Sequence, residues 1–298
     1  MQAYKEYLFV PEYVALVEKL DFRDFQAFLF AKSIASLQKN GLNIDCYSFQ
    51  INVDLLIPEV DHPRACSLKD ILERQSNLDL WLLTDGYSLL DRITGKLNRK
   101  VLEAGNWINR KLITPVPVDD WGDSERTIER SGIGLWQADS FIEGHVRPSI
   151  QESTPPLDGI PNELLESRRS LTSSTPPESS ELLLENLRQH LNKQEFFLLS
   201  ACSVFPDLPC ELPIRLSQRL KADGQLISSE VNLFKLARLP WFRLGRMPNW
   251  VRKELILLLS SEQEKQVRRV LFDWLSEHRQ ERGAGSNLEI FRLSLIHI

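Results

Sequence analysis

The sequence predicts an α/β fold with a mainly parallel sheet over residues 1–150, followed by a smaller all-α helical domain over residues 181–292. Three patterns lead to this prediction. In the first half, short apolar runs alternate with segments of helical periodicity, which is typical of βαβ crossovers. Residues 151–180 are rich in Ser, Thr and Pro and poor in apolar side chains, so we expect a flexible linker. Beyond the linker, apolar residues recur at helical spacing.

The elements of the first domain follow one another as strand, helix and strand. Tyr7–Val10 is a short apolar run that ends at Pro11, and we predict the first strand there. A helix is expected over residues 21–37, ending at Asn40 and Gly41. The later elements are a second strand at Leu42–Phe49, a helix from its cap Ser67 to Leu72, and strands at Asp79–Thr84, Lys111–Val116 and Ile133–Gln137.

Five helical segments are predicted in the second domain, because apolar residues recur there every three or four positions and Pro or Gly separates the runs. They are Glu181–Val204, Leu212–Leu220, Glu230–Leu239, Asn249–Leu259 and Glu262–Arg282. This pattern indicates an all-helical module.

The net charge restricts the kinds of partner. The chain has 298 residues, a formal charge of -5 and a pI near 5.7. From residue 181 to 292 there are 17 Lys and Arg against 14 Asp and Glu, a balance of +3, which leaves -8 for the remainder. These charges argue against a protein whose whole surface serves nucleic acid or anionic lipid, although the C-terminal third is basic.

Cysteines and chain ends give further expectations. The four cysteines form no CxxC pair, and no histidine lies at zinc-finger spacing, so we expect reduced thiols. No signal peptide or membrane-spanning run is recognisable, which favours a cytoplasmic location and no membrane partner. Leu293–Ile298 (LSLIHI) looks like the translation of a sequencing adaptor. We therefore expect the natural protein to continue beyond Arg292 and to hold an effector domain there.

Carboxylates follow two of the predicted strands. Asp85 comes directly after the apolar run of the third strand, and Asp119 and Asp120 follow the fourth. Parallel sheets bind ligands at the carboxyl ends of their strands, so these side chains, with Glu12 after the predicted first strand, are candidate ligands of a divalent cation such as Mg²⁺. The alternative is structural: Asp119 or Asp120 caps the next helix while Trp121 packs against the sheet.

The run Leu82–Gly86 (LLTDG) resembles the fourth-strand motif of von Willebrand factor A (vWA) domains, in which the Asp belongs to a metal-ion-dependent adhesion site. The resemblance implies a Rossmann-like sheet and a metal-ligand position for Asp85. The family takes its other ligands from an Asp-x-Ser-x-Ser run after the first strand and from a later Thr. Residues 10–15 (VPEYVA) offer only Glu12, and Ser67, near the expected Thr, precedes a helix as a cap does. We therefore expect a degenerate domain without a cofactor.

Longer blocks are similar to a family of uncharacterised multidomain bacterial proteins of the conflict-system or signalling kind. These blocks are residues 82–97 (LLTDGYSLLDRITGKL), 107–125 (WINRKLITPVPVDDWGDSE), 199–205 (LSACSVF) and 236–252 (LARLPWFRLGRMPNWVR). The resemblance implies that the vWA-like domain is paired with a helical module, and it implies no catalytic residues.

Basic and aromatic residues are interleaved between Arg238 and Lys253, where five cations occur and no acid. Arginine contacts phosphates and aromatic rings stack on bases, so a surface for nucleic acid or phosphate is one hypothesis. Its candidate contacts are Arg243, Arg246, Arg252 and Lys253, with Arg243 and Arg246 expected to be the most exposed. The alternative hypothesis is that the aromatic residues wedge two helices apart while the arginines bond helix C-terminal carbonyls.

Three functions are compatible with these patterns. The fingerprints of the main hydrolase, NTPase, zinc-protease and dinucleotide-binding families are absent, which makes an enzyme the less favoured class. We expect a non-catalytic protein-interaction or scaffold module of a signalling or defence-type protein, whose partners are other proteins. The alternatives are a metal-dependent binder or hydrolase centred on Asp85, and a nucleic-acid-sensing helical module.

Overall fold

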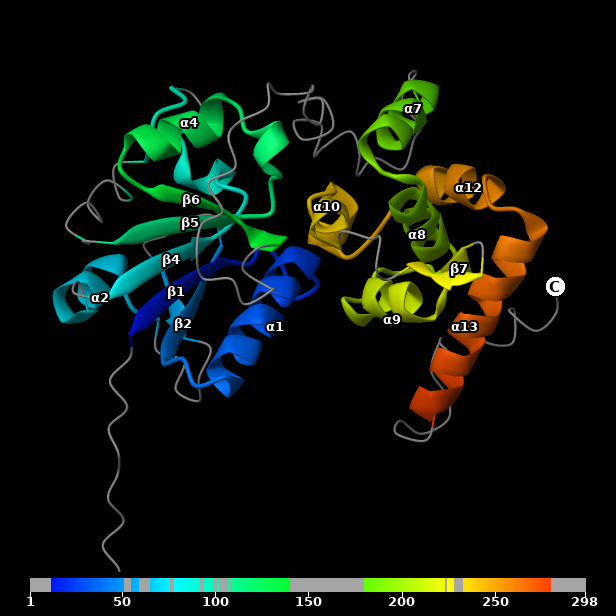
Figure 1. Ribbon diagram of the computed structural model, residues 1–298, viewed down its shortest axis with the longest axis horizontal. Helices are drawn as coiled ribbons and strands as arrows, with labels where there is room; N and C mark the ends of the chain where they lie inside the picture. The colour runs from blue at the N-terminus through cyan, green and yellow to red at the C-terminus, as the bar shows by residue number, and fades with distance from the viewer. Residues whose placement is uncertain are drawn as a thin grey trace, which may run out of the picture. The chain divides into compact units, whose positions relative to one another are not determined.

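The computed structural model describes residues 12–50, 55–58, 65–75, 78–91, 94–98, 101, 107, 109–139, 180–222, 224–227 and 233–279. The chain divides into two compact units, Met1–Gly159 and Ile160–Ile298, which are drawn in Figure 1 and are described one at a time. The division falls within the predicted linker 151–180, nearly all of which lies outside the described residues. The suspected adaptor sequence also lies outside them.

A six-stranded sheet forms the centre of the first unit (Figure 1). Its strands are β1 (Tyr13–Glu18), β2 (Ile44–Phe49), β3 (Ile57–Pro58), β4 (Asp79–Leu83), β5 (Arg110–Thr114) and β6 (Gly134–Gln137). They lie in the order β3-β2-β1-β4-β5-β6, and every neighbouring pair is parallel except β2 and β3. The predicted mainly parallel α/β fold is thus confirmed. This strand order is that of doubly wound sheets.

Helices cover the sheet because each crossover between parallel strands crosses one of its faces. Helix α1 (Phe25–Lys39) connects β1 to β2 and packs on β1. The opposite face carries the side chains of Val14 and Leu16, which share one apolar core with residues of α2 (Leu68–Gln75) and α4 (Asp123–Arg130). Side chains alternate between the faces of a strand, so both faces of the central strands are buried.

The first strand differs from the prediction. The structure places β1 at Tyr13–Glu18, whereas the predicted strand Tyr7–Val10 lies outside the described residues. Residues 14–18 are all buried, as expected of a central strand in a parallel sheet. Such a strand shows no alternation of apolar and polar residues, so its sequence resembles the start of a buried helix as much as a strand. Glu12 therefore precedes β1 rather than following a strand.

The helix ends of the first unit follow ordinary capping chemistry. The Asp24 carboxylate accepts a hydrogen bond of 3.2 Å from the Ala27 amide and caps α1. At α2, the Ser67 hydroxyl accepts from the Asp70 amide at 3.1 Å, and the Asp70 carboxylate accepts from the Ser67 amide at 3.0 Å. The predicted capping role of Ser67 is confirmed by this reciprocal pair.

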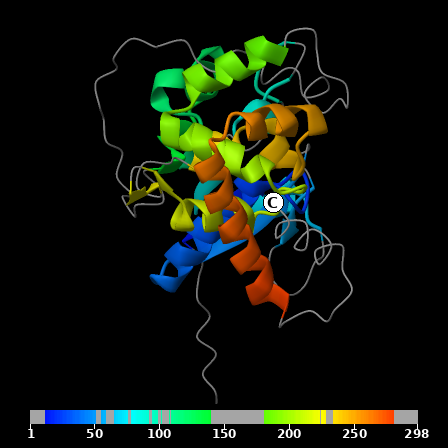
Figure 2. The same ribbon diagram turned by 90° about the vertical axis from the view of Figure 1, so that its right-hand side faces the viewer.

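The second unit is mostly helical in its described residues. Its helices are α7 (Ser180–His190), α8 (Lys193–Ser203), α9 (Glu211–Arg219), α10 (Leu233–Ala237), α11 (Pro240–Leu244), α12 (Asn249–Leu257) and α13 (Ser261–Arg279). A small antiparallel hairpin of β7 (Lys221–Ala222) and β8 (Gln225–Leu226) departs from the all-helical expectation. Figures 1 and 2 show α13 beside α9, and Glu277 of α13 forms ion pairs with Arg215 and Arg219 of α9 at 3.1 and 3.2 Å.

The helix predicted over residues 181–204 is interrupted in the structure. Helix α7 ends at His190, and α8 begins at Lys193. Between them, the Asn192 side chain accepts hydrogen bonds from two amides of the new helix, and the Glu195 carboxylate accepts from the Asn192 amide at 2.9 Å. This capping box starts a second helix although the apolar periodicity continues across the break.

Candidate functional site

The sheet has a topological switch point between β1 and β4. Strands β1 and β4 are neighbours, but the chain continues from β1 toward β2 on one side and from β4 toward β5 on the other. In open α/β sheets, ligands bind at the carboxyl ends of the strands at such a point. Here Glu18 ends β1, and Thr84 and Asp85 directly follow β4. We call this end of the sheet the carboxyl edge.

A buried hydrogen bond joins the two central strands at the carboxyl edge. The Thr84 hydroxyl donates to a Glu18 carboxylate oxygen at 2.6 Å, and the exposed fractions of the two side chains are 0% and 3%. The register of β1 and β4 pairs Val17 with Leu83, which brings the next residue of each strand side by side. The Thr84 oxygen also accepts from the Gly86 amide at 3.0 Å. Both polar groups thus serve the fold itself.

Asp85 is held in the turn that leaves β4. One of its carboxylate oxygens accepts a hydrogen bond of 3.1 Å from the Tyr87 amide, and the residue is 9% exposed. Gly86 has a φ of 88°, and a Cβ there would lie 3.0 Å from Cδ1 of Ile128. The positive φ favours glycine, and the close Ile128 methyl group adds to that preference. The turn fixes the direction of the Asp85 side chain and engages part of its hydrogen-bonding capacity.

The four predicted metal ligands are not brought together at one edge. Because Glu12 directly precedes β1, it lies at the amino edge of the sheet, opposite Asp85, and the strand that it was expected to follow, Tyr7–Val10, lies outside the described residues. Asp119 and Asp120 do follow β5 and share the carboxyl edge with Asp85. Within the part of the chain that the structure describes, no three His, Cys, Asp or Glu side chains are arranged to hold a metal ion.

The turn after β5 also differs from the predicted capping. Asp119 and Asp120 lie in a short 3-10 turn over Val118–Asp120 rather than at the start of α4. The N-cap of α4 is Gly122, whose amide donates to the Glu125 carboxylate at 2.9 Å, so the proposed capping by either Asp was wrong. Glu125 supplies the hydrogen bond from within the helix.

The sequence reasoning missed two buried polar side chains near the carboxyl edge. Glu18 was overlooked because β1 was placed too early in the chain. Gln26, in the first turn of α1, is fully buried, and neither its amide oxygen nor its amide nitrogen has a hydrogen-bond partner among the described residues. Buried amides are rarely left unpaired. A glutamine inside an apolar helix face is the one signal that could have identified it.

The basic and aromatic segment of the second unit is largely a packing element. Trp241 and Phe242 are buried in α11, which begins at Pro240 and ends at Gly245 with a φ of 67°. Arg243 is only 3% exposed, so the expectation that it is among the most exposed arginines was wrong. The same short helix that buries the aromatic rings buries this guanidinium group.

Arg252 has a defined structural partner. Its guanidinium group donates to the backbone oxygens of Ser203 at 3.0 Å and Val204 at 3.4 Å, at the C-terminal end of α8. These carbonyls have no partner within their own helix turn, so the cation caps the helix. Partial burial lowers the pKa of Arg252, and the nearby Asp207 carboxylate opposes that shift. Among the four predicted phosphate contacts, Arg246 and Lys253 are exposed.

A shallow open groove of about 270 Å³ runs along α12. Its described lining residues are Asn249, Arg252, Lys253, Ile256 and Leu257. Leu257 and the next residue, Leu258, are 68% and 40% exposed. The groove therefore combines two cations with the exposed apolar side chain of Leu257.

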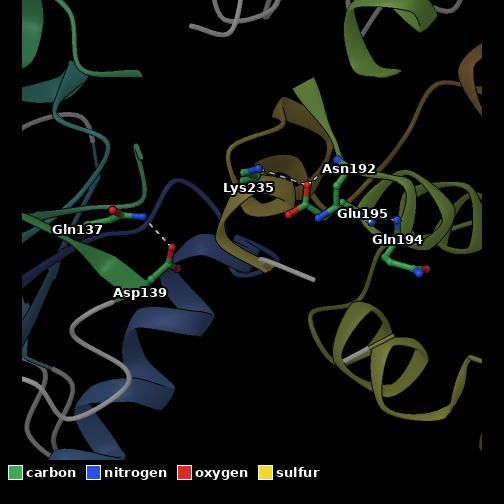
Figure 3. A network of polar contacts seen from close by, with 6 residues as sticks. All are labelled: Gln137, Asp139, Asn192, Gln194, Glu195 and Lys235. Atoms are coloured by element: carbon green, nitrogen blue, oxygen red, sulfur yellow. Dashed lines mark hydrogen bonds and ion pairs between the residues drawn. The ribbon is translucent and has the colours of Figure 1, made fainter. Parts of the chain in front are cut away.

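Figure 3 shows polar contacts in each unit. In the first, the Gln137 amide at the end of β6 donates to the Asp139 carboxylate at 2.8 Å. In the second, the Glu195 carboxylate that caps α8 also receives the Lys235 ammonium group of α10 at 3.5 Å. Glu195 is 1% exposed, and its charge is stabilised by the cation and the backbone amide together.

Comparison with protein-family models, with curated proteins and with solved structures finds no match to this chain. The fold and the geometry of its edges are therefore the basis for assigning a function. Among the residues that the structure describes, no helix has both the length and the apolar character needed to cross a bilayer.

Proposed function

We propose that this chain is a non-catalytic protein-interaction module, in which a degenerate vWA-like α/β unit and a helical segment serve as a scaffold. The mainly parallel sheet and the Asp directly after β4 support the vWA-like assignment. The chain presents side chains for contact with other proteins and performs no reaction of its own.

The hydrogen bond between Thr84 and Glu18 is the observation that carries this proposal. A metal-dependent binder needs several oxygen ligands that are held open toward the cation. Here the Glu18 carboxylate lies buried against Thr84, and Asp85 is turned toward the Tyr87 amide. The position where doubly wound sheets bind ligands is thus stabilised by its own side chains.

Metal-dependent hydrolysis and nucleic-acid sensing have less support. The metal hypothesis requires Glu12 and Asp85 to converge, but they lie at opposite edges of the sheet. For nucleic-acid sensing, Arg243 is buried and Arg252 bonds the end of α8, which leaves Arg246 and Lys253 as the exposed cations of the predicted set. Two exposed cations give a weak electrostatic attraction to nucleic acid.

Affinity capture tests the proposal. The purified chain is immobilised and incubated with a lysate of the source organism, and retained proteins are quantified by mass spectrometry. We expect a discrete protein partner that is retained in stoichiometric amount and is unaffected by nuclease or by EDTA. Failure to retain any protein, or retention that EDTA abolishes, contradicts the proposal. Asp85→Asn is the matched variant, and it is expected to leave the capture unchanged.

A further inference from the structure

The groove along α12 is lined by one face of that helix. Its described lining residues are Asn249, Arg252, Lys253, Ile256 and Leu257. These positions recur at spacings of three or four residues, so they share one face, which is about 12 Å long from Asn249 to Leu257. The opposite face of α12 packs into the unit through the buried side chains of Val251 and Leu255. The helix thus packs on one side and is open on the other.

The groove presents a cation that is available to a partner. None of its described lining residues is an acid. The Arg252 guanidinium group is bonded to the end of α8 and is therefore set aside. The Lys253 side chain is exposed, and it has no hydrogen-bond or ion-pair partner among the described residues. Lys253 can therefore pair with a carboxylate of another molecule.

The first turn of α12 adds to the positive potential at the groove. The N-cap of α12 is Pro248, and no side chain in the described part of the chain accepts a hydrogen bond from the amides there. The amides at the start of a helix carry the positive end of its dipole. Since Asn249 lines the groove and is the first residue of the helix, this end of the dipole lies at the groove.

The other end of the groove is apolar. Leu257 is 68% exposed, and Ile256 beside it is partly exposed. Leu257 follows Lys253 by one helical turn, which is about 6 Å along the axis. A partner that covers Leu257 removes its apolar surface from water, which favours binding. The groove thus places an unpaired ammonium group and an exposed apolar side chain one turn apart.

We propose that the groove along α12 is the docking site for an acidic amphipathic helix of a partner protein. This inference rests on the proposed interaction function and specifies the surface and the chemistry of the partner. The partner helix places an apolar side chain over Leu257 and an Asp or Glu carboxylate at Lys253. Residues four positions apart on a helix share one face, so the spacing of the two partner side chains matches that of Lys253 and Leu257.

The two ends of the groove together favour a protein helix over nucleic acid or a membrane. A phosphate pairs with Lys253 but gains nothing from Leu257. A bilayer buries side chains that project from an amphipathic helix, whereas these side chains line a groove. A basic helix is repelled by Lys253. An acidic helix with an apolar side chain matches both ends.

Fluorescence anisotropy with synthetic helical peptides tests this inference on the full chain. The probe is a labelled peptide of Ala and Gln that carries Leu and Glu four residues apart on one face. The comparison peptides replace Glu by Lys or Leu by Ser. We expect saturable binding of the Leu-Glu peptide that weakens as salt is added, and at least about tenfold weaker binding of both comparison peptides.

Variants locate the binding to the groove. Leu257→Ser is expected to weaken the Leu-Glu peptide about tenfold or more. Lys253→Glu is expected to weaken it similarly and to strengthen binding of the Leu-Lys peptide, because the charge at the groove is reversed. The matched controls are Leu226→Ser on β8, where Leu226 is 46% exposed, and Lys265→Glu on α13, where Lys265 is exposed. No binding of the Leu-Glu peptide, or equal binding by Leu257→Ser or Lys253→Glu, overturns the inference.

Two further probes test the other occupants. A single-stranded DNA oligonucleotide and vesicles that contain phosphatidylserine are titrated with the unchanged chain and with Lys253→Glu. We expect no binding of either probe that depends on Lys253. Binding of either one that is lost in Lys253→Glu overturns the inference, because the groove would then serve phosphates.

The capture experiment separates this inference from the proposed function. If the Leu257→Ser chain retains the same partner as the unchanged chain, the docking site is elsewhere and the interaction function still stands. If the unchanged chain retains no partner, the proposed function itself is contradicted. Circular dichroism of each variant confirms that the exposed substitutions leave the fold intact.

Discussion

The hydroxyl of Thr84 and the carboxylate of Glu18 form a buried hydrogen bond of 2.6 Å between the two central strands of the sheet. Removing the Thr84 hydroxyl leaves the buried Glu18 carboxylate with one hydrogen-bond donor fewer. Thr84→Val keeps the shape of the side chain, so we expect it to lower the free energy of unfolding by about 1–3 kcal/mol. Urea denaturation measures the loss. Thr84→Ser retains the hydroxyl and is expected to lose less, and equal losses in both variants contradict the assigned role of the bond.

Arg252 caps the end of α8, whereas Lys253 beside it is exposed. We expect Arg252→Ala to lower the free energy of unfolding by about 1 kcal/mol, because two backbone carbonyls lose a charged donor. Lys253→Ala is the matched control and is expected to change stability little. Denaturant melts of the two variants provide the comparison. If Arg252→Ala left the free energy of unfolding unchanged, the capping role of this arginine would be contradicted.

Burial raises the pKa of the Cys202 thiol, which lies in α8 and is fully buried. At neutral pH the thiol is protonated in both states, but above about pH 8.5 the unfolded chain releases this proton and the native chain does not. Stability is therefore expected to fall as the pH rises through this range, and less so in Cys202→Ala. Urea melts at several pH values measure the difference. If the free energy of unfolding fell equally with pH in the unchanged chain and in Cys202→Ala, the burial of this thiol would be contradicted.

Alkylation measures how accessible the thiols of the four cysteines are in the native protein. Cys46 and Cys66 are partly exposed, whereas Cys202 and Cys210 are buried. Because the reactive species is an accessible thiolate, iodoacetamide is expected to label the first pair in the native protein and the second pair only after denaturation. Peptide mass spectrometry assigns the labelled positions. Early labelling of Cys202 would mean that α8 opens readily.

Much of the fold could be predicted from local patterns. The strands at β2, β4, β5 and β6 and the cap at Ser67 depend on apolar runs and on side-chain capping, which act over a few residues. The misplacement of β1 has a physical cause. A central strand buried on both faces lacks alternation, so its limits depend on neighbours that are distant in sequence. The two-residue strand β3 is too short to leave a pattern.

The candidate site was predictable only in part. Whether a residue lies at the amino or the carboxyl edge depends on whether it precedes or follows its strand, so an error in the strand limits changes the edge. Asp85 was located correctly because the strand before it was. Because β1 begins at Tyr13 and not at Tyr7, Glu12 lies at the amino edge of the sheet and Glu18 lies at the carboxyl edge. The burial of Arg243 depends on how α11 packs, which no local pattern of charges reveals.

Calorimetric titration with Mg²⁺ and Mn²⁺ tests most directly the claim that the switch-point carboxylates serve the fold. The titration compares the unchanged chain with the Asp85→Ala variant, at metal concentrations up to the millimolar range. Since Glu18 is engaged by Thr84 and Asp85 by the Tyr87 amide, we expect no saturable heat in either chain. Saturable heat in the unchanged chain that disappears in Asp85→Ala would contradict the account and establish a metal site at the carboxyl edge.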